Sequence, residues 1–328
     1  MRVGITAMKA PSARLALLFS CLGHAYMHLF TAFYFVIALS LEADWGIPNH
    51  ELIKLWALGS LLVGLAALPA GWLGDRWSAS GMMTVFFIGL GISGIVCGLV
   101  NSTLALMLGL SAIGLFSAIY HPVGIAWLVK SARARGMALA VNGIFGSLGV
   151  ASAGLVAGVL IDAVSWRAAF IVPGSLCLVT GLALALSLRL GWVREAEGDQ
   201  VAEPAPSRGD MVRVYAVLLM TMAVMGLLFH ATQASLPRMF DLRLRDFAGE
   251  GALGIGALVA LVYTAGGLMQ LAGGWLADRF PLKPIYLGAF LFQVPVMALI
   301  ATTGSPLLIA LAIFTVILSS AALPAENM

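Results

Sequence analysis

The sequence predicts an all-α polytopic membrane protein that crosses the bilayer ten times. The chain has 328 residues, of which 61% are hydrophobic and only 10% are charged, and its mean hydropathy is +1.01. Soluble domains usually carry about 25% charged residues, so a water-soluble chain of this size could not hide so much apolar surface. Long stretches without Asp, Glu, Lys or Arg also recur along the whole chain. A membrane-spanning helix needs about 20 such residues.

These charge-free stretches divide the chain into the expected helices. Six of them have the length of one crossing, whereas two are long enough for two crossings and must turn back once. We expect those turns at Asn101-Ser102-Thr103 and at Thr303-Gly304-Ser305-Pro306, because Asn, Gly, Ser and Pro favour turns. In chain order the stretches are 15–41, 55–74, 77–129, 136–161, 168–188, 214–237, 251–277 and 284–325.

The distribution of positive residues predicts the orientation of these helices. With the N-terminus in the cytoplasm, thirteen of the 18 Lys and Arg residues fall on the cytoplasmic side, and the other five are Lys54, Arg167, Arg238, Arg243 and Arg245. An excess of Lys and Arg in cytoplasmic loops is typical of membrane proteins. We therefore expect a cell inner membrane protein with a cytoplasmic N-terminus. The charges form only short clusters, so no nucleic-acid partner is expected.

A repeat divides the chain into two halves. The sequence from Gly71 to Trp77 reads Gly-Trp-Leu-Gly-Asp-Arg-Trp, and from Gly274 to Phe280 it reads Gly-Trp-Leu-Ala-Asp-Arg-Phe, at an offset of 203 residues. Parallel repeats of this kind are known in secondary transporters. The long polar stretch between the halves predicts a cytoplasmic linker. The expected domains are 1–190 with six helices, the linker 191–212, and 213–328 with helices seven to ten.

The doubled loop resembles the Gly-x-Leu-(Gly/Ala)-Asp-Arg signature of the major facilitator superfamily, and Trp166-Arg167-Ala168-Ala169-Phe170 is similar to another element common there. Within the superfamily, Leu22-Gly23-His24 and the segment 117–122 resemble the fosmidomycin-resistance group of efflux proteins. The resemblance implies the major facilitator fold, with two six-helix bundles. Because members have twelve helices, the second bundle is expected to be incomplete and the chain to be truncated at its C-terminus.

The resemblance also implies a gating role for the loop motif, as a latch between the halves. By analogy, Asp278 is expected to reach the start of the fifth helix near Arg135, whereas the partner of Asp75 would lie in an eleventh helix that is absent. The alternative is that Asp75 and Arg76 simply end a helix in solvent. The expected gating residues are Gly71, Gly74, Asp75, Arg76, Gly274, Asp278, Arg279 and Arg135.

Five ionisable residues interrupt the apolar helices, and such groups usually face a cavity or a partner. They are His24, His28, His121, His230 and Glu326, and they lie on the first, fourth, seventh and tenth helices. The resemblance assigns these four helices to the central cavity. Tyr120 precedes His121, and Gln233 lies one helical turn after His230. We expect these seven residues to form the substrate and proton site, because histidine exchanges protons near neutral pH. The alternative is that each imidazole only anchors helices to one another.

The expected function is a secondary active transporter that moves a small solute by alternating access, coupled to protons, with efflux favoured over uptake. It is expected to be a monomer in the lipid bilayer and not an enzyme. No ATP-binding loop motif occurs, the cysteines show no metal-binding spacing, and no cofactor or metal is expected. Two alternatives remain open: an intramembrane redox protein with haem ligated by histidine, and a non-functional fragment of a transporter.

Overall fold

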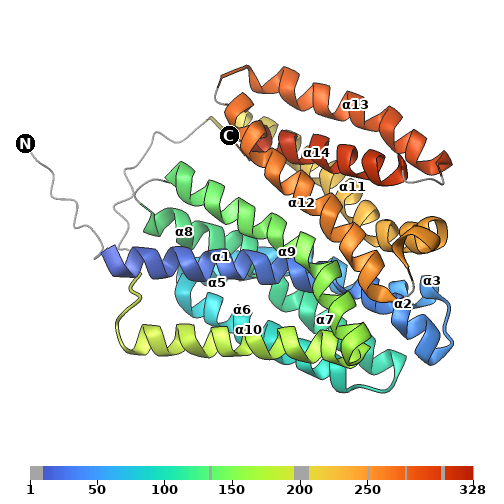
Figure 1. Cartoon of the computed structure of the whole chain (residues 1–328). Helices are drawn as coiled ribbons and strands as arrows, with labels where there is room; N and C mark the ends of the chain where they lie inside the picture. The colour runs from blue at the N-terminus through green and yellow to red at the C-terminus, as the bar shows by residue number, and fades with distance from the viewer. Residues whose placement is uncertain are drawn as a thin grey trace, which may run out of the picture.

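The computed structural model describes residues 10–132, 135–195, 207–249, 251–277, 279–303 and 307–327, and all regular structure in these ranges is helical (Figure 1). Within them, nine helices or helix pairs are long and apolar enough to cross a membrane, and Leu307–Ser319 is a shorter apolar helix. The predicted all-α membrane fold is confirmed. The elements are α1 (Ala10–Ala32), α2 (Tyr34–Trp45), α3 (Asn49–Lys54), α4 (Ala57–Leu65), α5 (Ala67–Arg76), α6 (Ala79–Leu99), α7 (Thr103–Ser117), η1 (Tyr120–Gly124), α8 (Ile125–Ser131), α9 (Arg135–Ala163), α10 (Trp166–Arg189), α11 (Arg208–Ala248), α12 (Ala252–Ala277), α13 (Leu282–Thr302) and α14 (Leu307–Asn327).

The first long charge-free stretch turns back where the sequence predicts, whereas residues 304–306 of the second predicted turn lie outside the described residues. The first turn lies between α6 and α7, where the Ser102 hydroxyl caps α7 by accepting a hydrogen bond from the Ala105 backbone N–H. Arg167 of α10 holds the same turn by donating to the carbonyls of Gly98 and Val100, at 3.1 and 2.8 Å. This contact gives the Trp166-Arg167 element a structural role. The second turn begins after α13 ends at Thr302.

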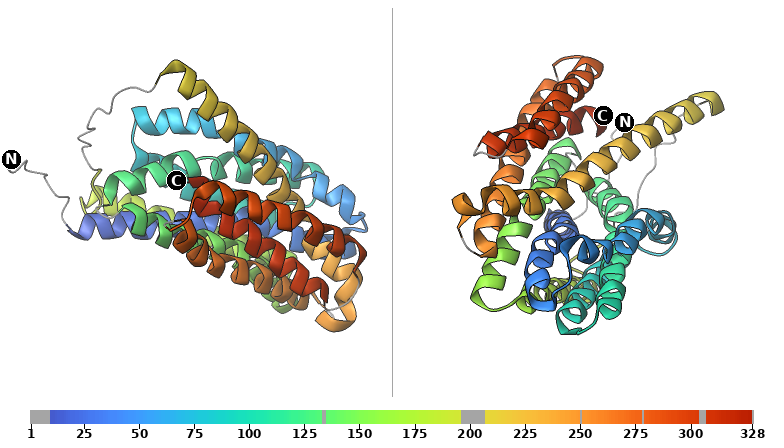
Figure 2. Two further views of the ribbon diagram at one scale, coloured as in Figure 1. Left: turned by 90° about the horizontal axis from the view of Figure 1, so that it is seen from above. Right: turned by 90° about the vertical axis from the view of Figure 1, so that its right-hand side faces the viewer.

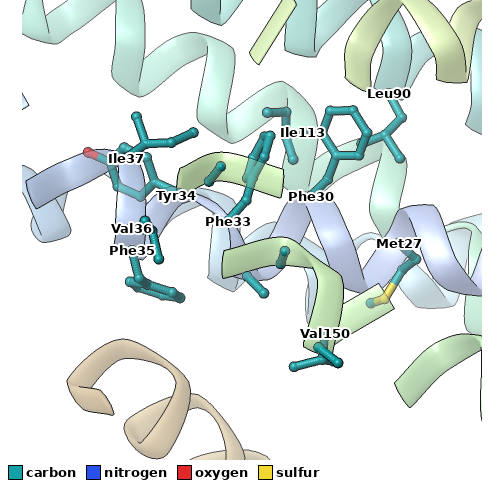
Figure 3. Packing of buried hydrophobic residues seen from close by; sticks show 14 of the residues in the cluster. Met27, Phe30, Phe33, Tyr34, Phe35, Val36, Ile37, Leu90, Ile113 and Val150 are labelled. Atoms are coloured by element: carbon teal, nitrogen blue, oxygen red, sulfur yellow. The ribbon is translucent and has the colours of Figure 1, made fainter. Parts of the chain in front are cut away.

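Aromatic side chains and closely packed glycines hold the first bundle together. Phe30, Phe33 and Tyr34 are fully buried, and Figure 3 shows Phe30 and Phe33 among the neighbouring helices. Helices α6 and α10 approach so closely that a Cβ atom on Gly91 would lie 2.5 Å from a backbone nitrogen of α10. Such packing of small residues is a common way to join helices in membranes, where lipid removes the hydrophobic drive for association.

The second half of the chain contacts the first mainly through two helix pairs, α9 with α12 and α2 with α11.

We call the side at which α1, α6, α9 and α11 begin the linker side, and the opposite side the distal side. Towards the distal side, a Cβ atom on Gly256 of α12 would overlap the carbonyl oxygen of Gly154 of α9. On the linker side, every residue from Ser207 to Val217 is exposed, and α11 begins well apart from the first bundle (Figure 2).

A carboxylate fixes the junction of α9 and α12 at the distal side. The side chain of Asp162 accepts hydrogen bonds from the backbone N–H groups of Ala252 and Leu253, at 3.0 and 2.8 Å. The first N–H groups of a helix have no partner within the helix, and they attract negative charge. The end of one bundle therefore caps a helix of the other.

Candidate functional site

Three imidazoles meet in the first bundle. His24 and His28 lie one turn apart on α1, and their Nε2 atoms are 3.2 Å apart. The ring of His121, from η1, lies 5.5 Å from that of His24 and 5.7 Å from that of His28, measured between centroids. We call these three residues the histidine cluster. The sequence predicted their shared location from their helices, and the structure brings them into direct contact.

The backbone at His121 departs from the α-helix. The segment Tyr120–Gly124 forms one π-helical turn between α7 and α8. Pro122 has no N–H with which to continue an α-helix, which explains the wider turn at this point. Single π-turns within α-helices occur frequently at functional sites. The turn presents His121 towards α1, where it meets His24.

A buried hydrogen-bond network orients the cluster. The Nδ1 atom of His24 lies 2.8 Å from the backbone carbonyl of Asn142, and the ring stacks on Tyr120 at 4.9 Å and an interplanar angle of 21°. The Tyr120 hydroxyl donates to the backbone carbonyl of Ser20 at 2.9 Å and accepts from the Asn142 side-chain amide at 2.8 Å. The sequence analysis missed Ser20 and Asn142. Their polarity within charge-free stretches was a weak signal.

The second bundle contributes an aromatic wall. Phe229 of α11 contacts His28, with ring centroids 6.1 Å apart. His230, the next residue, is half-buried, and no hydrogen bond or ring contact links it to the cluster among the described residues. Gln233 is buried, and neither polar atom of its amide has a hydrogen-bond partner in the described structure. The side chain of Glu326 lies outside the described part of the chain, so its predicted role stays a prediction.

The glycines of the first loop motif serve close packing. A Cβ atom on Gly71 would lie 3.2 Å from Pro122, and one on Gly74 would lie 2.8 Å from Val123. Helix α5 therefore packs directly on η1, the turn that carries His121. This contact links the predicted gating loop to the predicted solute site through a single helix turn.

The charged residues of that motif find partners within the first bundle. The Asp75 carboxylate lies 3.6 Å from the Lys130 ammonium at the end of α8, and Arg76 stacks over the Trp72 ring at 4.7 Å. Asp75 is 73% exposed, so this ion pair contributes little stability. Asp75 and Arg76 therefore make local contacts within the first bundle, and their predicted gating role stays a prediction.

The second copy of the motif is described only in part. Gly274 lies in α12, and Arg279 follows it with a backbone N–H that donates to the Leu276 carbonyl at 3.1 Å. Asp278 lies outside the described residues, as does the side chain of Arg135. The predicted latch between Asp278 and the start of α9 therefore stays a prediction.

A glutamate after α10 completes the linker side of the first bundle. Oε1 of Glu195 accepts hydrogen bonds from the Ser80 backbone N–H and from the hydroxyls of Ser78 and Ser80, at 2.7–2.8 Å. Partial burial acts to raise the pKa of Glu195, but these hydrogen bonds outweigh it and hold the pKa below its ordinary value. The carboxylate therefore serves as an N-terminal cap for α6.

We expect Glu195→Gln to destabilise the chain by about 0.5–1 kcal/mol at neutral pH, because a neutral amide binds the α6 N-terminus less strongly and the site is partly exposed. A lowered folded-state pKa stabilises the fold above the ordinary carboxyl pKa, and this stabilisation is lost as the pH falls through the folded-state value. The stabilities of the wild-type chain and of the Glu195→Gln chain should therefore become equal in acid. Thermal unfolding in detergent at neutral and acid pH measures this, with Asp246→Asn, an exposed carboxylate on α11, as the control. If the difference in unfolding temperature between the wild-type and Glu195→Gln chains stayed the same in acid, this would contradict the capping role.

An ionic cluster joins the two bundles at the distal side. Arg238 of α11 donates at 2.9 Å both to Glu42 of α2 and to Asp241, and Arg245 also bonds to Asp241. The side chain of Asp241 is only 9% exposed. Glu42 further accepts from the Asn49 backbone N–H at 3.0 Å. This cluster and the hydrogen bonds from the start of α12 to Asp162 of α9 hold the two bundles together at the distal side, whereas the described start of α11 on the linker side is exposed.

The fold and the site together define a class of protein: a multi-pass membrane transporter with a polar site enclosed by apolar helices. The family model described as the Major Facilitator Superfamily matches residues 18–327. The chain belongs to this superfamily. The predicted family is thus confirmed, and the subgroup remains a prediction. Comparison with curated protein sequences finds no match.

Solved structures of this fold are similar over nearly the whole chain. A bacterial homologue of the human lysosomal transporter Spinster, inward-facing and occupied, gives a TM-score of 0.75 at 16% identity over 97% of this chain and 74% of that one. The xylose transporter XylE from E. coli, partially occluded and inward open, gives a TM-score of 0.70 at 12% identity, over 96% of this chain and 85% of that one. The nucleoside transporter NupG gives a TM-score of 0.66 at 13% identity, over 95% of this chain and 81% of that one. At these identities the likeness concerns the fold.

Proposed function

We propose that the chain is a secondary active transporter that moves a small solute across the inner membrane by alternating access, as a monomer with a cytoplasmic N-terminus. The moving bodies are residues 1–190 and 213–328, joined by the linker 191–212. The observation that carries the proposal is the position of the histidine cluster. It lies inside the membrane-spanning region, beside Phe229 of the opposite bundle, with the distal side closed and the linker side parted.

The asymmetry between the two sides supports a state that is open to the linker side. Contacts between Glu42 and Arg238, and between Asp162 and α12, act only at the distal side. A transporter must break such contacts to expose its site to the other side of the membrane. The charge distribution of the loops favours a cytoplasmic linker, so this state corresponds to an inward-facing one.

Proton coupling is proposed from the chemistry of the cluster, and efflux from the subgroup resemblance. Imidazole exchanges protons near neutral pH, and buried ionisable groups in membrane helices commonly mark ion pathways. Efflux of a solute in exchange for entering protons would make the chain an antiporter. The substrate class would be a small solute that contacts the cluster and the aromatic ring of Phe229.

Spin labels on the two sides test the proposal without knowledge of the solute. One pair of labels replaces exposed residues on the linker side, Leu139 of α9 and Val214 of α11, and the other replaces Val164 and Leu242 on the distal side. Alternating access predicts two populations of distances for each pair of labels. When conditions shift the balance between the two states, the distance on one side should lengthen while the distance on the other side shortens. One fixed distance for both pairs would overturn the proposal. A Soret band of the purified chain would instead support the haem alternative.

A further inference from the structure

The histidine cluster has the geometry of a metal site. One ligand nitrogen from each of His24, His28 and His121 lies within 4.8 Å of the others. The Nε2 atoms of His24 and His28 are 3.2 Å apart. Two ligands of a tetrahedral ion with Zn–N bonds of about 2.0–2.1 Å would lie roughly 3.3 Å apart. The nitrogen of His121 would have to move closer to the other two to complete the same coordination sphere.

The surroundings of His24 favour coordination. Its Nδ1 lies 2.8 Å from the Asn142 carbonyl, so Nδ1 carries the proton and donates, which leaves the lone pair of Nε2 directed at His28. Metal-binding histidines almost always donate their other N–H to a carbonyl or carboxylate in this way. Stacking on Tyr120 fixes the plane of the ring. The ligand is therefore oriented before any ion arrives.

The other two histidines would have to adjust in order to coordinate an ion. Coordination by His28 through Nε2 would displace its contact with His24 and move the ring proton to Nδ1, which is buried without a hydrogen-bond partner in the described structure. His121 is the exposed member of the three and lies on the π-helical turn. Among the described residues, no Cys, Asp or Glu completes the group. Three imidazoles with an open fourth position match the ligand set of open zinc sites.

We propose that the histidine cluster binds one divalent transition-metal ion of the zinc class, with one coordination position left open. Imidazole suits zinc, copper and nickel, whereas magnesium and calcium prefer oxygen ligands. The sequence predicted no metal, because its cysteines lack a metal-binding spacing, and the proximity of His121 to His24 arises only in the fold. The proposal concerns binding at the site to which the transport function is assigned, and it does not depend on transport.

Metal titration of the purified full chain, without a polyhistidine tag, tests the proposal. Co²⁺ serves as the spectroscopic probe and Zn²⁺ as the competitor. We expect visible d–d bands of a four-coordinate Co²⁺ ion, and these bands should saturate at one ion per chain. Addition of Zn²⁺ should abolish them. His24→Ala and His121→Ala should each weaken binding by at least about tenfold, since loss of even an outer partner costs about 10–100-fold. Mg²⁺ should not compete.

The controls separate this site from adventitious binding and from misfolding. His50→Ala removes a histidine that is 72% exposed on α3 and should leave affinity unchanged. His121→Ala removes a side chain without a hydrogen bond in the described structure, so a normal thermal melt of this variant shows that the fold is intact. Binding that persists in both cluster variants, or no saturable Co²⁺ spectrum in the wild-type chain, would overturn the proposal. If the chain bound metal but the spin labels showed only one population of distances, the proposed transport function alone would be overturned.

Discussion

Gly256→Val is expected to prevent the distal side from closing and to shift the chain towards the state open on that side. A side chain at this position would overlap the carbonyl of Gly154, so α9 and α12 would have to separate. Inserting atoms into a packed contact costs about 1–3 kcal/mol. Under the proposed alternating access this contact exists only when the distal side is closed, so the cost should change the ratio of the two states by about 5–150-fold.

The distance between spin labels at positions 164 and 242 measures the effect of this substitution. We expect the longer distance to dominate in the Gly256→Val chain. Gly288→Val on α13 is the matched control, because a Cβ atom there would meet nothing within 4 Å. If the short distance still dominated in the Gly256→Val chain, the contact between α9 and α12 would not decide which side is closed.

Arg238→Ala is expected to loosen the distal side by removing the ionic link between the bundles. The substitution leaves Glu42 without its arginine and Asp241 with Arg245 alone. Breaking a fully buried pair costs about 3–5 kcal/mol, and the partial exposure of Arg238 and Glu42, 34% and 31%, should lower this cost to roughly 1–2 kcal/mol. The ratio of the closed to the open state should therefore fall by about 5–30-fold.

The same label pair measures the Arg238 effect, and Arg243→Ala provides the control from the same helix. Arg243 donates to the carbonyls of Ile300, Ala301 and Thr303 within the second bundle, so its removal should leave the balance of states unchanged. Adding Glu42→Gln to Arg238→Ala should have little further effect, because the two residues act as a pair. Equal responses to both arginine substitutions would show that the effect is a general loss of stability.

The membrane-spanning helices could be predicted because their signal is local. Lipid penalises charge within each span, so the stretches between charges mark the helices, and the turn at Asn101-Ser102 appears as predicted. The loop motif was recognised from its repetition. The partners against which its glycines pack, Pro122 and Val123, became apparent only in the fold.

The parts that could not be predicted depend on residues far apart in the chain. Glu42 and Arg238 are 196 positions apart, and Glu195 and Ser80 are 115 apart, so no local pattern links them. The histidines were singled out because ionisable groups are costly within a bilayer, but Asn142 is neutral and carried no comparable signal. A neutral amide becomes informative only when its partner is known.

The central claim is that the histidine cluster is reached from the two sides of the membrane in alternation. A single cysteine in place of Phe229, which faces His28, tests it in a chain whose buried Cys21, Cys97 and Cys177 are replaced by alanine. A membrane-impermeant thiol reagent is added to either side of oriented vesicles. The account predicts labelling from both sides in this chain, and a strong bias towards the distal side once Gly256→Val is added. Labelling from one side only, unaffected by Gly256→Val, would contradict it.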